Sequence, residues 1–355
     1  MLLAIAVVHG LFLLTLLMNL VFVRSYRGRA GSPQPSVTVL IPARNEETNL
    51  GRLLPSLAEQ NYPNFDVLVY DDGSEDGTWD VIQQHASQDA GGAQIRGLKG
   101  SGPAPGWVGK VHALYQATRH ATGDVWMFLD ADTKLADPDA LSRLVARFHA
   151  LPENSVLTGF NQLRGGGLML VSLVPYVLIS SLPWPLVRWL PLRSLGAVNG
   201  QFWMVRRRHY QELEPHEAHK DEVLEDVMIG RYFQANGIHP YMLDVQNEIS
   251  VWMYTSFSDA WQGFRKNAYL LLGGTVISFV LLFTMFVSVW VAGPWLSWWF
   301  LGALYLGKFI TDRFGRFPFW LTLLAPVSFA LAAVLQFDSA LAHWTGRVKW
   351  KGRTV

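Results

Sequence analysis

The chain has 355 residues, half of them apolar, and a formal net charge of +1 at pH 7. This near-neutral balance provides no basic excess to neutralise phosphates, which argues against nucleic acid as a partner. The absence of cysteine excludes disulfides, thiolate metal ligands and a cysteine nucleophile, so any metal site must use oxygen or imidazole ligands. Fifteen tryptophans, many close to apolar runs, are typical of a protein whose aromatic rings lie at the two faces of a bilayer.

The first apolar run, Leu2 to Val23, is long enough to cross the roughly 30 Å hydrocarbon layer as a helix. Arg24, Arg27 and Arg29 follow it, whereas a cleaved signal peptide would begin with basic residues and have a shorter apolar core. By the positive-inside rule, the chain beyond this run lies in the cytoplasm. We therefore expect residues 1–30 to anchor a cytoplasmic domain to a membrane, which in a bacterium is the inner membrane.

After a short Gly/Ser/Pro linker at Gly31 to Pro35, β-branched runs alternate with segments of helical periodicity. This pattern predicts an α/β fold in which helices cover a mostly parallel, Rossmann-like sheet. One helix, with apolar residues from Leu141 to Phe148, is expected to open with Asp137 as its cap and Pro138 at its first position. The predicted strands are Val37 to Ile41, Asp66 to Tyr70, Gln94 to Leu98, Val125 to Leu129 and Val156 to Phe160.

Three more apolar regions lie further along the chain. Leu168 to Leu190 is interrupted by prolines, so we expect helices in the membrane interface, with a buried lid as the alternative. Tyr269 to Ile310, broken at Gly293-Pro294, predicts two helices, and Pro318 to Phe337 predicts a third. The expected organisation is thus a catalytic domain at residues 36–267, transmembrane helices at 268–340 and a basic tail at 341–355.

The charges conflict with a simple count of these spans. One N-terminal and three C-terminal spans would place Arg347, Lys349, Lys351 and Arg353 outside, whereas the positive-inside rule places both that tail and Lys308 to Arg316 inside. Either one apolar segment is re-entrant, for example at Pro326, or the charge bias fails.

Asp130-Ala131-Asp132 follows the apolar run Val125 to Leu129, at the end of a predicted buried strand, where open α/β sheets bind their ligands. Two carboxylates one residue apart can share Mg²⁺ or Mn²⁺, which would neutralise the diphosphate of a nucleotide sugar. A solvated turn is the alternative for so short a motif.

Two other predicted strands also end in polar groups. Pro42-Ala43-Arg44-Asn45-Glu46 follows the first strand, and Asp71-Asp72-Gly73-Ser74 follows the second. Side chains such as Asn45, Glu46 and Asp72 can accept hydrogen bonds from a base imide N–H and from ribose hydroxyls. We therefore expect the three strand ends to form one nucleotide-binding crevice, although Asn45 and Asp76 also fit as helix caps.

Other charged residues near helix starts are candidates for the same site. Lys110 precedes a predicted helix and could contact phosphate, or could be an exposed lysine. Glu225-Asp226 opens another helix, where a carboxylate could take a proton from an attacking hydroxyl or simply stabilise the helix dipole. Arg265 and Lys266 precede the C-terminal apolar region, and they either bind diphosphate or mark a cytoplasmic flank.

Together these residues resemble the family 2 glycosyltransferases with the GT-A fold, over roughly Val37 to Asn267. The resemblance implies that Asn45, Glu46 and Asp72 bind the nucleoside, as part of the Pro42-Ala43-Arg44-Asn45-Glu46 loop and the Asp-Asp-Gly-Ser turn. It also implies that Asp130 and Asp132 bind metal and diphosphate, and that Asp226 is the catalytic base.

A membrane-bound branch of that family is the more similar one, including carotenoid glycosyltransferases of the 4,4'-diaponeurosporenoate type and hopanoid-associated enzymes. The motifs that carry this likeness are Gly106 to Lys110, Phe128 to Thr133, His216 to Asp226 and Trp350 to Arg353. Two segments depart from the pattern: Lys266 stands where the Gln-x-x-Arg-Trp motif has tryptophan, and Trp252 precedes Met-Tyr where arginine is expected.

The resemblance implies an inverting transfer of a sugar from a nucleotide donor, with UDP-hexose as the expected donor, to a hydroxyl or carboxylate of a membrane lipid such as a carotenoid or hopanoid. A processive polysaccharide synthase and a non-catalytic membrane scaffold with the same fold are the alternatives.

Overall fold

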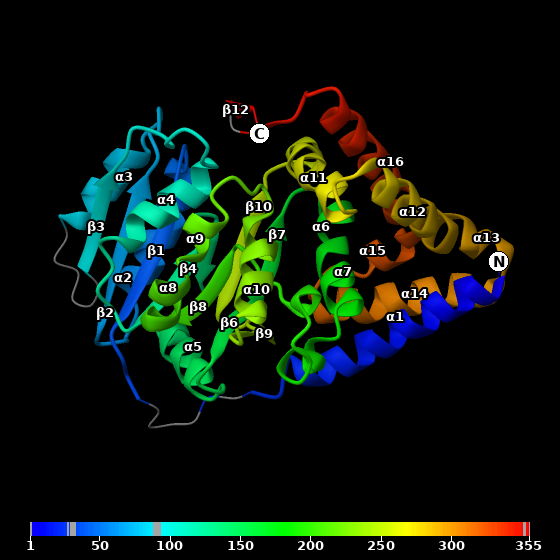
Figure 1. Ribbon diagram of the computed structural model, residues 1–355, viewed down its shortest axis with the longest axis horizontal. Helices are drawn as coiled ribbons and strands as arrows, with labels where there is room; N and C mark the ends of the chain where they lie inside the picture. The colour runs from blue at the N-terminus through cyan, green and yellow to red at the C-terminus, as the bar shows by residue number, and fades with distance from the viewer. Residues whose placement is uncertain (1, 27, 29–32, 88–93, 351–352, 355) are drawn as a thin grey trace. The chain divides into compact units, whose positions relative to one another are not determined.

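The computed structural model describes residues 2–26, 28, 33–87, 94–350, 353 and 354. It contains two compact units, whose elements are drawn in Figure 1. The α/β unit comprises Phe22–Gln162 and Trp184–Val251, and the helical unit comprises Met1–Val21, Leu163–Pro183 and Trp252–Val355. Of the basic residues expected to flank the membrane, Arg27, Arg29 and Lys351 lie outside the described residues.

A seven-stranded sheet forms the centre of the α/β unit, in the order β3-β2-β1-β4-β8-β6-β9. Strands β3, β2, β1 and β4 run parallel, β8 is antiparallel to both of its neighbours, and β9 is parallel to β6. The predicted, mostly parallel sheet is therefore confirmed. The strands are β1 (Val37–Ala43), β2 (Phe65–Asp71), β3 (Gln94–Lys99), β4 (Val125–Leu129), β6 (Ser155–Phe160), β8 (Phe202–Arg206) and β9 (His239–Asp244).

Apolar side chains from both faces of this sheet explain why these short segments form strands. Every residue of β4 is buried, as expected for a strand covered on both sides. Phe128 of β4 stacks on Trp203 of β8 with ring centroids 3.9 Å apart, and both rings are buried in the main core cluster.

Helices cover the sheet, and the loop before one of them departs from expectation. The helix predicted to start at Pro138 begins instead at Ala140, with Asp139 as its N-cap residue. Asp137 is occupied elsewhere: its carboxylate accepts the Asp139 backbone N–H and pairs with Arg143 at 2.7 Å, forming a turn ahead of the helix. The helices are α2 (Glu47–Ala58), α3 (Thr78–Ala86), α4 (Gly109–Thr118), α5 (Ala140–His149), α8 (Arg207–Leu213), α9 (Pro215–Ala218) and α10 (Glu225–Ala235), with 3₁₀ turns η1 (Trp184–Arg188) and η2 (Arg193–Leu195).

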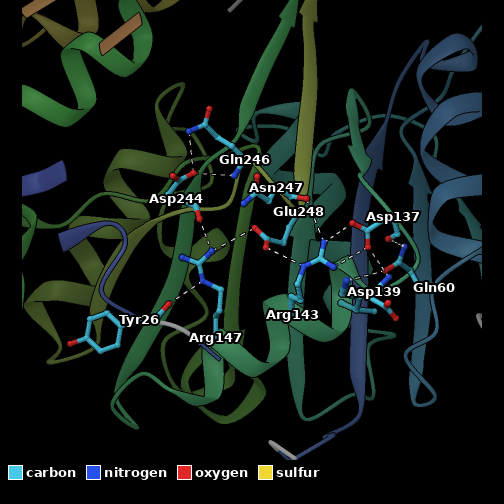
Figure 2. Close-up of polar contacts among 11 residues, drawn as sticks. Tyr26, Gln60, Asp137, Asp139, Arg143, Arg147, Asp244, Gln246, Asn247 and Glu248 are labelled. Carbon is cyan, nitrogen blue, oxygen red and sulfur yellow. Dashed lines mark hydrogen bonds and ion pairs between the residues drawn. The ribbon is translucent and has the colours of Figure 1, made fainter. Parts of the chain in front are cut away.

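Two arginines of α5 connect this helix to distant parts of the α/β unit (Figure 2). Arg147 donates to the backbone carbonyls of Tyr26, just beyond the first apolar helix, and of Asp244 at the end of β9. Both Arg143 and Arg147 pair with Glu248, at 3.3 and 3.6 Å. Glu248 is 5% exposed, so its charge depends on these two partners. The network therefore holds the segment after the first helix against the rest of the α/β unit.

Short strands complete the chain. β5 (Thr133–Leu135) pairs antiparallel with the first residues of β10 (Ile249–Tyr254). The boundary between the two units falls within β10 and within β7 (Gln162–Gly165). β11 (Lys349–Trp350) and β12 (Arg353–Thr354) form an antiparallel pair in the tail.

Three helical segments of the helical unit are long and apolar enough to cross a membrane: Leu2–Phe22, Val276–Leu296 and Ala325–Trp344. The second is built from three labelled pieces and continues through Gly293-Pro294, ending at Leu296; the break lies at Ser297, slightly later than predicted. The helices are α1 (Leu2–Phe22), α6 (Leu168–Val171), α7 (Leu173–Ser181), α11 (Phe257–Leu271), α12 (Val276–Phe286), the π-helix η3 (Val287–Ala292), α13 (Gly293–Leu296), α14 (Trp298–Phe314), α15 (Trp320–Leu323) and α16 (Ala325–Trp344).

The proline-interrupted region after β7 forms only short helices. Tyr176 of α7 is 1% exposed and packs against Phe12 of α1, Trp290 of η3 and Phe329 of α16. Residues 168–181 are thus part of the core of the helical unit, while residues 184–188 belong to the α/β unit as a 3₁₀ turn. No single helix runs through the whole region.

Candidate active site

Three parallel strands present their polar ends at the same edge of the sheet. β1 pairs in register with both β2 and β4, so the residues that follow these strands are neighbours. Asp72 directly follows β2 and donates its backbone N–H to the carbonyl of Ala43, the last residue of β1. The backbone N–H of Asp130, after β4, donates to Gln201 O in the turn before β8. The strand register therefore brings the three predicted strand ends to the same edge of the sheet.

Lys110, at the start of α4, joins two acidic parts of this edge. Its ammonium lies 2.7 and 2.9 Å from the two carboxylate oxygens of Asp130, and 3.4 Å from Glu225 Oε1. It also donates to the carbonyl of Gly200 at 3.3 Å. These two carboxylates raise the pKa of Lys110 even though burial alone would lower it, so the lysine stays charged.

Asp226 lies beside this cluster, in the first turn of α10. Its Oδ2 accepts the backbone N–H of Gly200 at 3.1 Å, and its Oδ1 accepts that of Val227 at 2.8 Å. Burial, followed by the nearby Glu225 carboxylate, raises the pKa of Asp226 to about 6, although Lys110 and the two N–H donors oppose the shift. A carboxylate with a pKa near neutrality is suited to accept a proton.

Gly200 brings the backbone close to both charged groups. A Cβ atom at this position would lie 3.0 Å from Asp226 Oδ2 and 3.2 Å from Lys110 Nζ. The preceding loop is held in place because Asn199 donates its backbone N–H to Thr158 Oγ1 and its side-chain amide to the Gly159 carbonyl. A residue with a Cβ at this position would require Asp226 or Lys110 to move by a few tenths of an ångström.

The loop after β1 is arranged around the turn after β2. Asn45 adopts φ 52°, its backbone N–H donates to Ser74 Oγ at 2.9 Å, and its side-chain oxygen accepts the Glu75 N–H at 2.9 Å. Glu46 donates its backbone N–H to Thr78 Oγ1. Pro42 and Ala43 are the last two residues of β1. Asparagine adopts this left-handed conformation more readily than most residues, and its side chain stabilises the turn by accepting the Glu75 N–H.

Asp71 and Asp72 are both buried at the end of β2. Burial raises the pKa of Asp72 to about 6, the Asp71 carboxylate adds to the rise and the Arg44 guanidinium opposes it. Asp71 uses one carboxylate oxygen to accept the Ser74 N–H, which closes the turn. A raised pKa at this edge of the sheet marks Asp72 as a group that a ligand N–H or hydroxyl would stabilise.

The site also offers ligands for a divalent cation. Asp130 and Asp132 provide hard oxygen donors at one strand end. The carboxylate of Asp130 also contacts the ammonium of Lys110. Among the described residues, no group of three or more His, Cys, Asp or Glu side chains is arranged to hold a metal. The two aspartates therefore fit Mg²⁺ or Mn²⁺ only as part of a coordination sphere that diphosphate and water oxygens would complete.

Arg265 and Lys266 belong to α11 in the helical unit. Arg265 Nε lies 3.0 Å from Asp338 of α16, and the Lys266 carbonyl is within hydrogen-bond distance of His343 Nε2, at 3.0 Å. These contacts give Arg265 a local partner, and its predicted place beside a diphosphate stays a prediction. The cluster described above unites Lys110, Asp130 and Asp226 without either residue.

Gly200 and His216 were not singled out as site residues from sequence, and Glu225 was named only together with Asp226 as a possible proton acceptor. Glu225 shares Lys110 with Asp130, and its position next to Asp226 in the first helical turn was the available signal. Gly200 lies in a loop close to Asp226 and Lys110, and no local sequence pattern predicts this proximity. His216 is buried beside Tyr210, with a ring nitrogen 2.6 Å from its hydroxyl, and burial together with Lys110 lowers its pKa to about 3, so it is neutral.

Comparisons with known proteins show which proteins this chain resembles. The profile of Glycosyl transferase family 2 matches residues 38–168. The 4,4'-diaponeurosporenoate glycosyltransferase of Staphylococcus haemolyticus (strain JCSC1435) is 24% identical over 92% of this chain and 90% of its own length. The enzyme of the same name from Staphylococcus aureus (strain USA300) is 24% identical over 90% of this chain and 88% of its own. A solved mannosyltransferase from Pyrobaculum calidifontis, in complex with GDP-Man and Mn²⁺, is similar in fold, with a TM-score of 0.62, 18% identity and 97% coverage of both chains.

Proposed function

This chain carries a family 2 glycosyltransferase domain on a GT-A fold, and we propose that it transfers a hexose from a nucleoside diphosphate to a hydroxyl of a membrane lipid. The observation that carries the proposal is the position of Asp226. Its carboxylate is held by two backbone N–H groups and is linked through Gly200 and Lys110 to Asp130 of the Asp-Ala-Asp turn. A proton acceptor is thereby kept next to the donor diphosphate site.

The nucleoside end of the donor is assigned to Asn45, Glu46 and Asp72, at the ends of β1 and β2. The Asp72 carboxylate can accept an imide N–H, and ribose hydroxyls can be held by the neighbouring polar groups. We propose UDP-hexose as the donor. The N–H groups of guanine could meet the same carboxylate, and a GDP-sugar is therefore the first competitor to test.

The diphosphate end is assigned to Asp130, Asp132 and Lys110, with Arg265 and Lys266 as proposed additional ligands. Asp130 and Asp132 would hold Mg²⁺ or Mn²⁺, which when bound neutralises the diphosphate and stabilises it as a leaving group. The Lys110 ammonium, held by Asp130 and Glu225, places a further positive charge at this end of the site.

The acceptor step follows from these assignments. The lipid hydroxyl attacks the anomeric carbon on the face opposite the diphosphate, so the configuration at that carbon inverts. Asp226 takes the hydroxyl proton as the new glycosidic bond forms and the bond to the diphosphate breaks. A carboxylate acceptor would arrive ionised and would have no proton to give, so a base at this position favours a hydroxyl.

The lipid class is proposed from the relatives and from the apolar helices. The named relatives act on a carotenoid acid, and the chain has three helices able to cross a membrane. The substrate in the relatives' name is a carboxylate, whereas the base assigned above suits a hydroxyl, so carotenoid and hopanoid acceptors with either group are the first to test, on the cytoplasmic side of a bacterial inner membrane.

A direct test combines donor choice with product analysis. The purified full-length protein in lipid nanodiscs is incubated with Mg²⁺ or Mn²⁺, UDP-glucose or GDP-mannose, and total lipids from the source cells. Mass spectrometry should find a lipid that gains one hexose with UDP-glucose and not with GDP-mannose. A polymer would instead indicate a polysaccharide synthase, and no transfer or hydrolysis from any donor would indicate a scaffold.

A further inference from the structure

The helical unit contains both apolar helices long enough to cross a membrane and shorter ones. The contacts inside this unit give the direction in which each helix runs. The segments long enough to cross are α1, the continuous run from α12 to α13, and α16. Helix α14 lies between the last two along the chain and has 17 residues, below the length that these three reach.

Helix α1 is antiparallel to the run Val276–Leu296. Gly293, near the end of that run, faces Ile5, because a Cβ there would lie 3.5 Å from Ile5 Cγ2. Further along α1, Phe12 packs on Trp290 with ring centroids 4.7 Å apart. The first residues of α1 therefore lie at the same end of the unit as Leu296.

Helix α16 is also antiparallel to that run. Ring contacts join Phe329 to Trp290 at 5.6 Å, Phe337 to Phe283 at 6.3 Å, and Trp344 to Phe279 at 5.6 Å. In these three contacts, the residue numbers rise along α16 as they fall along the run Val276–Leu296. Helix α16 therefore ends where α12 begins, at the end of the unit opposite Leu296.

Helix α14 enters from the Leu296 end and the chain then doubles back. Next to α1, Phe300 stacks on His9 at 5.5 Å, and a Cβ at Gly307 would lie 3.8 Å from Leu13, so α14 and α1 run in the same direction. After Phe314 the chain turns back, and Leu323 lies at the level of Tyr305. The Tyr305 hydroxyl donates to the backbone carbonyl of Leu323. This return is far shorter than the roughly 20 residues that a spanning helix needs.

Buried charges inside this hairpin are paired. Lys308 of α14 is 0% exposed and bonds to Asp312 on the same helix and to Ser172, between α6 and α7, at 3.0 Å. Asp312 also accepts the hydroxyl of Thr322, on the returning segment, at 2.7 Å. An ionisable pair at membrane depth is tolerated when it faces protein and is fully paired, and here it also fastens the returning segment to α14.

We infer that the chain crosses the bilayer three times, through α1, the run Val276–Leu296 and α16, with α14 and α15 forming a re-entrant hairpin. The segment after α1 and the C-terminal tail then lie on one side of the membrane. The turn around Leu296 lies at the other side.

The flanking residues give this arrangement an orientation. Arg24 follows α1, Arg265 and Lys266 lie in α11 ahead of α12, and Arg347 follows α16, so every one of these cations is at the same end. The opposite end, Ala292 to Phe300, has no charged residue. By the positive-inside rule the first end is cytoplasmic.

Tryptophans mark the opposite end as a bilayer interface. Trp295, Trp298 and Trp299 are 85%, 87% and 86% exposed, and rings of this kind are enriched at the level of lipid headgroups. Three crossings thus place the segment after α1 and the C-terminal tail on the same side of the membrane, which the count of four spans expected from the sequence could not do.

The absence of native cysteine makes the topology directly measurable, because a single introduced thiol is the only one that can react. The variants are Ser25→Cys, Leu296→Cys and Thr345→Cys in the full-length protein, each at an exposed position. A membrane-impermeant maleimide is applied to intact spheroplasts and, in parallel, to permeabilised ones. Insertion is checked by membrane fractionation of each variant.

The three-crossing arrangement predicts that Leu296→Cys is labelled in intact spheroplasts, whereas Ser25→Cys and Thr345→Cys are labelled only after permeabilisation. Labelling of Thr345→Cys from the side opposite Ser25→Cys would require an even number of crossings and would overturn the inference. Labelling of both from outside would overturn the orientation. The labelling needs no enzymatic activity, so it tests the topology independently of the proposed reaction.

Discussion

At the scale of single residues, the site depends on how charges are placed around Lys110. Asp130 and Glu225 surround the ammonium, while Asp226 is held by backbone N–H groups and not by the lysine directly. The carboxylate proposed as the base thus retains a pKa near neutrality, whereas a direct ion pair would lower it.

The raised pKa of Asp226 predicts a pH dependence of turnover. The base must be ionised, so kcat at saturating donor should be level above about 6 and fall by roughly tenfold per pH unit below it. Asp72 has a similar pKa and should affect the KM of the donor instead, so the two are separated by measuring both constants from pH 5 to 8. A kcat that stays constant down to the lowest of these pH values would contradict the role of Asp226.

A methyl group at Gly200 should disturb catalysis without unfolding the protein. In Gly200→Ala the new Cβ crowds Asp226 Oδ2 and Lys110 Nζ, and we expect kcat to fall by roughly tenfold or more because the reacting groups are displaced. The matched control is Gly51→Ala, a helical position with nothing within 4 Å of the added Cβ. Equal transfer rates for the two variants would show that Gly200 has no such role.

The sequence was informative about residues that stand in a local pattern. Asp130-Ala131-Asp132 follows a wholly apolar strand, and Asp226 opens a helix, so both could be identified as candidates. Gly200 and His216 could not, because their importance comes from side chains that are distant in sequence. The ion pair of Arg265 with Asp338 likewise depends on the packing of two helices.

At the scale of elements, the network of Glu248, Arg143 and Arg147 holds together α5, the start of β10 and the segment that follows α1 (Figure 2). Both arginines pair with the same buried carboxylate, so removing it affects both at once, although Arg143 also pairs with Asp137 and Arg147 also donates to two backbone carbonyls.

Glu248→Ala should destabilise the α/β unit by about 3 kcal/mol, because it leaves two arginines without the buried charge they share. Tryptophan fluorescence during heating, in detergent, should report a melting temperature several degrees lower. Glu59→Ala, which removes an exposed acid at the end of α2, is the control and should change little. Equal melting temperatures would mean that the network is not stabilising.

The strands that alternate with helices were predictable because their apolar runs are local, and β4 has the predicted bounds. The antiparallel β8 and the parallel edge strand β9 were missed, since Phe202–Arg206 and His239–Asp244 gain their apolar environment from neighbours far away in sequence. The start of α5 differed because Asp137 pairs with Arg143 and forms a turn.

At the scale of the whole molecule, the chain passes between the α/β unit and the helical unit after Val21, Gln162, Pro183 and Val251. Composition indicated a membrane protein, but the direction of its helices required the ring contacts of Trp290 and Phe279. The lipid acceptor proposed above is consistent with a chain whose helical unit contains three helices able to cross a membrane.

Removal of divalent cations should stop transfer. Chelation by EDTA is expected to abolish activity, and added Mg²⁺ or Mn²⁺ to restore it, because Asp130 and Asp132 alone do not complete a metal site. In Asp132→Asn the concentration of metal needed for half-maximal rate should rise. Full activity in EDTA would contradict the assignment of the two aspartates.

The most direct test of the account is transfer by Asp226→Asn, compared with Asp221→Asn, an exposed acid just ahead of α10. Transfer to the lipid acceptor and UDP affinity by calorimetry are measured on the same preparations. The account predicts that Asp226→Asn binds UDP normally and transfers roughly 10² to 10⁴ times more slowly, while Asp221→Asn resembles the wild type. Normal transfer by Asp226→Asn with unchanged UDP affinity would contradict it.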